Sequence, residues 1–159
     1  MTREAPLAAS PFPAVNTLLP ASGTGYYTYS TSRTRQWGRS ETIDAILAIG
    51  EAWMRDHPDP PLIGVGNISL RGGGPMPPHT SHRQGVDVDF RPLRKDGKAA
   101  PISYKQGQYS RERTVELVKF IRGNGVLGVV TILFNDTSIP GVRPWKGHDN
   151  HLHVRFREA

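Results

Sequence analysis

Two segments of the chain place apolar residues at the spacing of an amphipathic helix. In residues 40–55 the apolar positions recur every three or four residues, as they do along one helix face: Ile43, Ile46, Leu47, Gly50, Trp53 and Met54. Ser40 is expected to cap this helix, and the proline-rich run at 56–61 ends it. A second helix is predicted from Ser110 to Ile121, before the glycines at 123 and 125.

Four further segments are predicted to be strands. Residues 62–70 are short and partly apolar, and residues 126–134 are β-branched and apolar enough for a central strand. Residues 85–90 and 151–156 alternate apolar and polar side chains, which is the period of a strand with one buried face. The order of helix, strands, helix and strands predicts an α+β fold around a mainly antiparallel sheet flanked by helices.

Length and composition predict a single domain. The chain has 159 residues, which suffices for one hydrophobic core but leaves no room for a second domain of ordinary size. Residues 1–25 are rich in Ala, Pro, Ser, Thr and Gly, and we expect them to form an N-terminal arm. The domain is therefore predicted to occupy residues 26–159, and we expect it to be a monomer.

The positive net charge indicates an anionic binding partner but does not identify which kind. The chain carries a formal charge of +6 at pH 7, which attracts nucleic acids, anionic membranes and anionic cell-wall polymers alike. Its basic residues are scattered rather than interleaved with aromatics, so we do not expect a nucleic-acid partner. No apolar run is long enough to span a bilayer, and the start lacks the apolar segment of a secretory signal. We therefore expect synthesis in the cytoplasm and no stable membrane insertion.

The chain contains no cysteine, so metal or acid–base chemistry is left to histidines and carboxylates. Five of the six histidines fall in two clusters, one at 79–82 and one at 148–153. His151 and His153 are two residues apart in a predicted strand and so share a face, as Asp87 and Asp89 do in another. If the two strands are neighbours, two imidazoles and a carboxylate can converge on one metal ion.

Zinc is the natural ion for such a set. Two histidines and one carboxylate fill three tetrahedral positions and leave the fourth for water. A zinc ion with this coordination lowers the pKa of its water and polarises a carbonyl oxygen. We therefore expect one Zn²⁺ and hydrolytic chemistry.

Two blocks of the sequence together resemble a known family of metallopeptidases. The first block comprises Arg-Gly-Gly-Gly-Pro-Met at 71–76, His-Thr-Ser-His at 79–82 and Gly-Val-Asp-Val-Asp at 85–89. The second comprises Val-Arg-Pro-Trp at 142–145 and His-Asp-Asn-His-Leu-His-Val-Arg at 148–155. They are similar to the signatures of the clan that joins D-Ala-D-Ala peptidases, lysostaphin-type enzymes and hedgehog domains. Within that clan they resemble the penicillin-insensitive murein endopeptidases, which implies a hedgehog-like fold.

The resemblance also implies roles for individual residues. His82, Asp89 and His153 match the zinc ligands of the family. His148 and His151 match histidines that lie beside the metal without binding it in the active form. We expect His151 to stabilise the oxyanion or transfer a proton, and His148 to be the assisting base.

Four further residues have two interpretations each. His79 either approaches the metal or braces the site. Asp87 either replaces Asp89 as a ligand or contacts a basic group or a ligand histidine from behind. Arg71 either binds a carboxylate of a stem peptide or lies solvated on the surface, and Trp145 either walls the substrate groove or belongs to the core.

The activity implied by the resemblance is zinc-dependent hydrolysis of peptidoglycan cross-links, at the bond from D-alanine to meso-diaminopimelate. The alternatives are a D-Ala-D-Ala carboxypeptidase or other stem-peptide hydrolase, and a non-catalytic zinc-binding interaction domain. A wall hydrolase without a signal peptide or cysteine further suggests a phage endolysin that reaches the wall after release from the cytoplasm. A toxin delivered by cell contact is the alternative to an endolysin.

Overall fold

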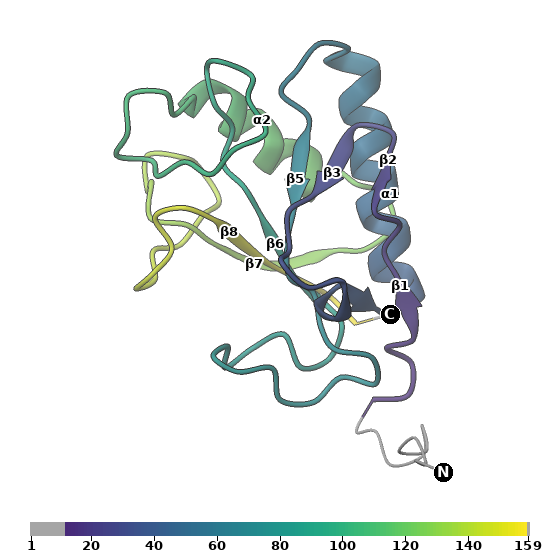
Figure 1. Ribbon diagram of the computed structural model, residues 1–159. Coiled ribbons are helices and arrows are strands. Elements are labelled where there is room, and N and C mark those ends of the chain that lie inside the picture. The colour runs from purple at the N-terminus through teal and green to yellow at the C-terminus, as the bar shows by residue number, and fades with distance from the viewer. Residues whose placement is uncertain (1–11, 159) are drawn as a thin grey trace.

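The computed structural model describes residues 12–158, whose main elements are two α-helices and a six-stranded sheet (Figure 1). The helices are α1 (Ser40–Asp56) and α2 (Arg111–Arg122). The sheet has the strand order β2-β3-β5-β6-β8-β7, and its only parallel pair among these residues is β3 with β5. Its strands are β2 (Ser22–Gly23), β3 (Tyr26–Thr28), β5 (Ile63–Val65), β6 (Asp87–Phe90), β7 (Val129–Leu133) and β8 (Leu152–Phe156). The predicted α+β fold with a mainly antiparallel sheet is confirmed.

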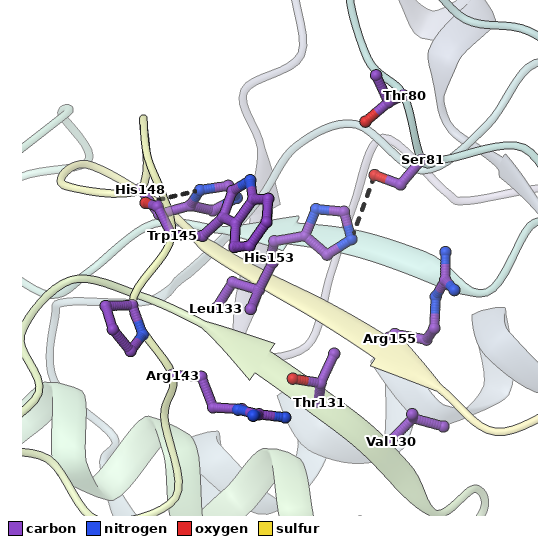
Figure 2. A pocket seen from close by; sticks show the side chains of 11 residues that line it. Thr80, Ser81, Val130, Thr131, Leu133, Arg143, Trp145, His148, His153 and Arg155 are labelled. Atoms are coloured by element: carbon purple, nitrogen blue, oxygen red, sulfur yellow. Dashed lines mark hydrogen bonds between the residues drawn. The ribbon is translucent and has the colours of Figure 1, made fainter.

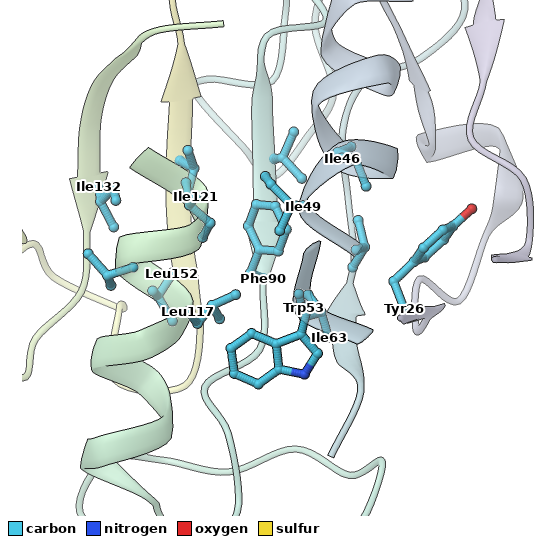
Figure 3. Packing of buried hydrophobic residues seen from close by; sticks show 14 of the residues in the cluster. Tyr26, Ile46, Ile49, Trp53, Ile63, Phe90, Leu117, Ile121, Ile132 and Leu152 are labelled. Atoms are coloured by element: carbon cyan, nitrogen blue, oxygen red, sulfur yellow. The ribbon is translucent and has the colours of Figure 1, made fainter. Parts of the chain in front are cut away.

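Both helices bury their apolar faces against one face of this sheet. Figure 3 shows side chains from both helices meeting those of Phe90 in β6, Leu152 in β8 and Ile132 in β7. The helical contributors to this cluster include Ile46, Ile49, Trp53, Leu117 and Ile121. Because side chains alternate along a strand, the opposite face of the same strands carries polar residues. The candidate chemistry therefore lies on the face of the sheet that the helices leave uncovered.

The sequence predicted the N-terminal capping residue correctly for α2 and wrongly for α1. The hydroxyl of Ser110 caps α2 by accepting a hydrogen bond from the Arg113 backbone N–H at 3.2 Å, as predicted. Ser40 was expected to cap α1, but it is the first residue of that helix. Arg39 stands at the cap position and makes no side-chain capping bond. No helix among residues 12–158 is long and apolar enough to cross a membrane.

Two strand predictions need correction. The strand expected over 62–70 is confined to Ile63–Val65. The residues that follow it continue as irregular backbone, in which Gly66 and Asn67 still form hydrogen bonds with the backbone of Asp89. The strand expected over 126–134 is β7, which lies at the edge of the sheet and not in its centre. Its Val130 is 55% exposed, at a point where the pairing with β8 is irregular. β-Branched composition indicates a strand but does not specify its neighbours.

The described part of the predicted N-terminal arm is joined to the domain. A small sheet pairs β1 (Thr17–Leu18) with β4 (Trp37–Gly38), and a short 3₁₀ turn, Arg33–Arg35, precedes β4. The side chains of Val15 and Leu19 are fully buried. Residues 1–11 of the predicted arm lie outside the described residues.

Candidate metal centre

The register between β6 and β8 brings the two predicted polar faces together. Asp89 is paired with His153, and Asp87 with Arg155. The two strands are thus direct neighbours, as the convergence of histidines and carboxylates requires. All four residues of β6 are buried, so its polar face is covered by the site instead of being solvated. His151 precedes β8 and does not share the strand geometry expected for it.

His82 lies on the loop that covers this face, and its backbone is unusually constrained. Its side chain is fully buried, and its φ of 62° falls in the left-handed region, where few residues other than glycine occur. The Ser69 hydroxyl donates to the His82 carbonyl at 2.6 Å and accepts from the Gly85 N–H at 3.1 Å. The Nδ1 atom of His82 donates to the Ile68 carbonyl at 2.7 Å, which leaves Nε2 without a proton when the ring is neutral.

Two buried atoms at the centre of the site make no hydrogen bond. They are Nε2 of His82 and Oδ1 of Asp89, which lie 3.2 Å apart. A buried polar atom without a partner costs free energy unless another group satisfies it. Burial lowers the pKa of His82, but the Asp89 carboxylate outweighs that effect and raises it. The carboxylate thus favours a positive charge at this point, which a metal cation can supply as a proton does.

Two further imidazoles border this pair. The ligand atoms of His79, His82 and Asp89 all lie within 4.8 Å of one another. On the strand side, Nδ1 of His153 lies 3.7 Å from Oδ1 of Asp89. The rings of His79 and His153 are each centred 4.7 Å from that of His82. The donor set of nitrogen and carboxylate oxygen therefore fits a divalent metal such as zinc.

The neutral rings of His153 and His79 carry their protons on different nitrogen atoms. Asp87 accepts a hydrogen bond from Nε2 of His153 at 2.8 Å, so the lone pair of His153 is on Nδ1, the atom that faces Asp89. The amide of Asn67 donates to Nε2 of His79 at 3.1 Å, and its oxygen accepts from the Ser30 hydroxyl at 2.9 Å. The neutral His79 ring therefore carries its proton on Nδ1, and its lone pair is already engaged with Asn67.

Asp87 lies behind the site and does not face its centre. Its side chain is 1% exposed and accepts from Arg155 Nε at 2.9 Å and Nη2 at 3.1 Å, in addition to His153. Burial raises the pKa of Asp87, but the hydrogen bonds from His153 and Arg155 outweigh that effect and lower it to about 2. Of the two interpretations of Asp87, the structure favours contact with a histidine and a basic group.

His148 and His151 stand beside the centre with their rings 4.6 Å apart. The Nδ1 atom of His148 donates to the Lys146 carbonyl at 3.0 Å and lies 3.3 Å from the Trp145 carbonyl, so its Nε2 is the free acceptor. Burial lowers the pKa of His151, although the Asp89 carboxylate acts in the opposite direction. Both rings lie close to His153, whose ring centre is 5.9 Å from that of His148.

A groove of about 790 Å³ opens beside His153 and His148 (Figure 2). Trp145 lines it with 65% of its surface exposed, so the structure favours a groove wall over a core residue. Arg71 does not belong to the residues that line the groove. Its guanidinium lies over the Trp37 ring, 5.3 Å from the ring centre. A substrate-binding role for Arg71 remains a prediction.

Three residues that position the site were not predicted from the sequence. Arg155 clamps Asp87, Asn67 holds His79, and Ser69 fixes the loop at His82. Arg155 was detectable, because it shares the face of His153 in the alternating strand at 151–156. Asn67 and Ser69 gave no such signal, since they follow β5 in a segment that was predicted to continue as a strand.

Comparison with known proteins identifies relatives of the chain. The family model of the penicillin-insensitive murein endopeptidases matches residues 14–124. A curated penicillin-insensitive murein endopeptidase of Haemophilus influenzae is 27% identical over 166 aligned positions, which cover 87% of this chain. The chain spans 57% of the length of that relative.

Proposed function

The chain belongs to the penicillin-insensitive murein endopeptidase family, and we propose that it is a zinc-dependent peptidase that cleaves peptide cross-links of peptidoglycan. One observation carries the zinc part of the proposal: the buried Nε2 of His82 and Oδ1 of Asp89 make no hydrogen bond and lie together at the centre of a histidine cluster. The proposed catalytic domain is the one predicted for residues 26–159, to which the buried Val15 and Leu19 add part of the preceding segment.

The proposed ligands are His82, Asp89 and His153, as the family resemblance implies. In His82 and His153 the nitrogen opposite the site donates to an oxygen, which directs the lone pair of the other nitrogen toward Asp89. This arrangement is typical of metal-ligating histidines. His79 has its lone pair engaged by Asn67, so we assign it the role of a brace.

A bound zinc ion would supply a polarised scissile carbonyl and a more acidic attacking water. The chain's own residues supply the proton transfers. The Nδ1 atom of His148 donates to the Lys146 carbonyl, so the neutral ring has its lone pair on Nε2, which can accept a proton from the attacking water and return it to the leaving amine. The Nδ1 atom of His151 donates to the side-chain oxygen of Asn150 at 2.9 Å, so Nε2 is its free nitrogen. Burial lowers the pKa of His151, and the ring can donate to the developing oxyanion from Nε2 once that atom carries a proton. Trp145 walls the groove that would hold the stem peptide.

We assign the cleaved bond as the one from D-alanine to meso-diaminopimelate. The test is digestion of purified peptidoglycan followed by mass spectrometry of the fragments, with chelator, and with zinc added back. We expect monomeric muropeptides with intact tetrapeptide stems, no product in chelator and recovery with zinc. Release of D-alanine alone would indicate a carboxypeptidase instead, and unchanged peptidoglycan would indicate a zinc-binding domain without catalysis.

We further propose that the protein acts as a phage endolysin, made in the cytoplasm and admitted to the wall through a membrane pore. The proposal is supported by the absence of cysteine, because folding then needs no oxidising compartment, and by the +6 charge, which attracts anionic wall polymers. Expression in a Gram-negative host should be tolerated until the inner membrane is permeabilised, and should then lyse the cells. Lysis with an intact membrane, or survival of permeabilised cells that contain active enzyme, would contradict this role.

A further inference from the structure

The groove begins at the candidate metal centre and continues over the neighbouring edge strand. Four residues of β8 and β7 form the floor of the groove. The register of the two strands places His153 beside Leu133 and Arg155 beside Thr131. Figure 2 shows Trp145 and His148 at one end of this floor. A peptide bound across the metal centre would therefore extend over β7.

The charge of the groove is entirely positive. No acidic side chain is among the described residues that line it, whereas two arginines are, Arg143 and Arg155. The charge of Arg155 is compensated, because its guanidinium forms two hydrogen bonds with the buried Asp87. The guanidinium of Arg143 has no hydrogen bond or ion pair within residues 12–158, so it is the uncompensated charge of the groove.

The backbone of Arg143 is nevertheless held in place by two hydrogen bonds. Its backbone N–H donates to the Ile132 carbonyl at 2.9 Å, and its carbonyl accepts from the Phe134 N–H at 2.9 Å. These bonds attach the Arg143 segment to the outer edge of β7, and the side chain extends along that strand toward Thr131 (Figure 2). An anchored backbone with a free guanidinium is suited to binding an anionic group of a ligand.

We propose that Arg143 is a specificity-determining residue that binds the carboxylate next to the scissile amide. This inference rests on the proposed function. In a cross-link from D-alanine to diaminopimelate, the carbon that carries the scissile nitrogen also carries a carboxylate. A guanidinium binds a carboxylate through two charge-assisted hydrogen bonds, whereas a carboxamide is neutral and offers only one acceptor oxygen. The enzyme therefore discriminates between cross-links whose diaminopimelate is free and those in which this carboxylate is amidated.

The test uses two synthetic cross-linked stem-peptide dimers that differ only in this group, carboxylate or carboxamide. We expect kcat/KM of the zinc-loaded protein to be roughly ten- to hundredfold higher for the carboxylate. Arg143→Gln should bring the ratio close to one, mainly by lowering cleavage of the carboxylate dimer. Arg143→Lys keeps the charge without the two-pronged geometry and should give an intermediate ratio. Lys146→Gln removes the same charge from the same loop outside the groove and should leave the ratio unchanged.

The outcomes separate this inference from the function on which it rests. If the wild-type protein cleaves neither dimer, the proposed function itself fails. If it cleaves both equally well, or if Arg143→Gln lowers both rates by the same factor, the function stands and the assignment of Arg143 is wrong. Thermal unfolding of each variant shows whether it folds. If Arg143→Gln has a folding defect, the ratio of kcat/KM between the two dimers for Arg143→Lys tests the assignment instead. A ratio for Arg143→Lys equal to that of the wild type would exclude two-pronged recognition.

Discussion

Replacing Asp87 by Asn removes the charge behind His153 while keeping the shape of the side chain, and we expect it to weaken zinc binding. Asp87 accepts three hydrogen bonds, one from His153 at 2.8 Å and two from Arg155 at 2.9 and 3.1 Å. A hydrogen bond between neutral groups contributes about 1 kcal/mol net to stability, and a hydrogen bond to a charged acceptor is about twice as strong. The Arg155 side chain is 45% exposed, so water replaces part of what it loses.

The remaining loss falls on His153, whose Nε2–H then faces a neutral oxygen or an amide. We expect this to weaken zinc binding by about 1 to 2 kcal/mol, or roughly five- to thirtyfold in Kd. The assay is competition for zinc with a chromophoric chelator at fixed pH. Asp96→Asn is the matched control, because Asp96 also pairs with two nitrogens of one arginine, Arg94, but on the surface. Equal Kd values for Asp87→Asn and the wild type would refute the role of Asp87 behind a ligand.

Three further predictions concern the proposed ligands and a hydrogen bond between Tyr109 and Asp136. His153→Ala and Asp89→Ala should lose zinc together with activity, whereas His151→Ala should keep the zinc and lose activity, as metal analysis of each purified variant will show. Tyr109→Phe should destabilise the metal-free protein by about 1 kcal/mol, because the Tyr109 hydroxyl donates to the carboxylate of Asp136 at 2.6 Å. Burial raises the pKa of Asp136, but hydrogen bonds from Ser138 and Tyr109 outweigh it and lower the pKa below its ordinary value. That contribution should therefore be full above about pH 4 and disappear as the pH falls through the lowered pKa, so acid unfolding curves of the two proteins should converge.

What the sequence predicted correctly depends on local or pairwise patterns. Ser110 caps α2 because a cap needs only the hydroxyl and the next turn of the helix. The alternation of polar residues in 85–90 and 151–156 placed Asp89 and His153 each on a polar face, but that the two strands are neighbours was only a condition of the metal site, which the register of β6 and β8 fulfils. The candidate ligands were taken from the resemblance to the family's motifs and not from the strand pairing itself.

What the sequence did not predict depends on the arrangement of the whole sheet. The position of β7 at the edge cannot be read from its β-branched residues, since central and edge strands share that composition. The tautomer of His79 depends on Asn67, which in turn is oriented by Ser30 from another part of the chain. Arg143 gains its significance only because Asp87 neutralises Arg155, the other arginine of the groove.

We propose that a single zinc ion, held by His82, Asp89 and His153, makes this chain a peptidoglycan peptidase. The most direct measurement is a titration of the metal-stripped protein with Zn²⁺ while the release of soluble peptidoglycan fragments is followed. We expect no hydrolysis without metal and a rate that rises linearly until it levels off at one zinc per chain. Full hydrolysis by protein shown to be free of metal, or no hydrolysis when one zinc per chain is bound, would contradict this proposal.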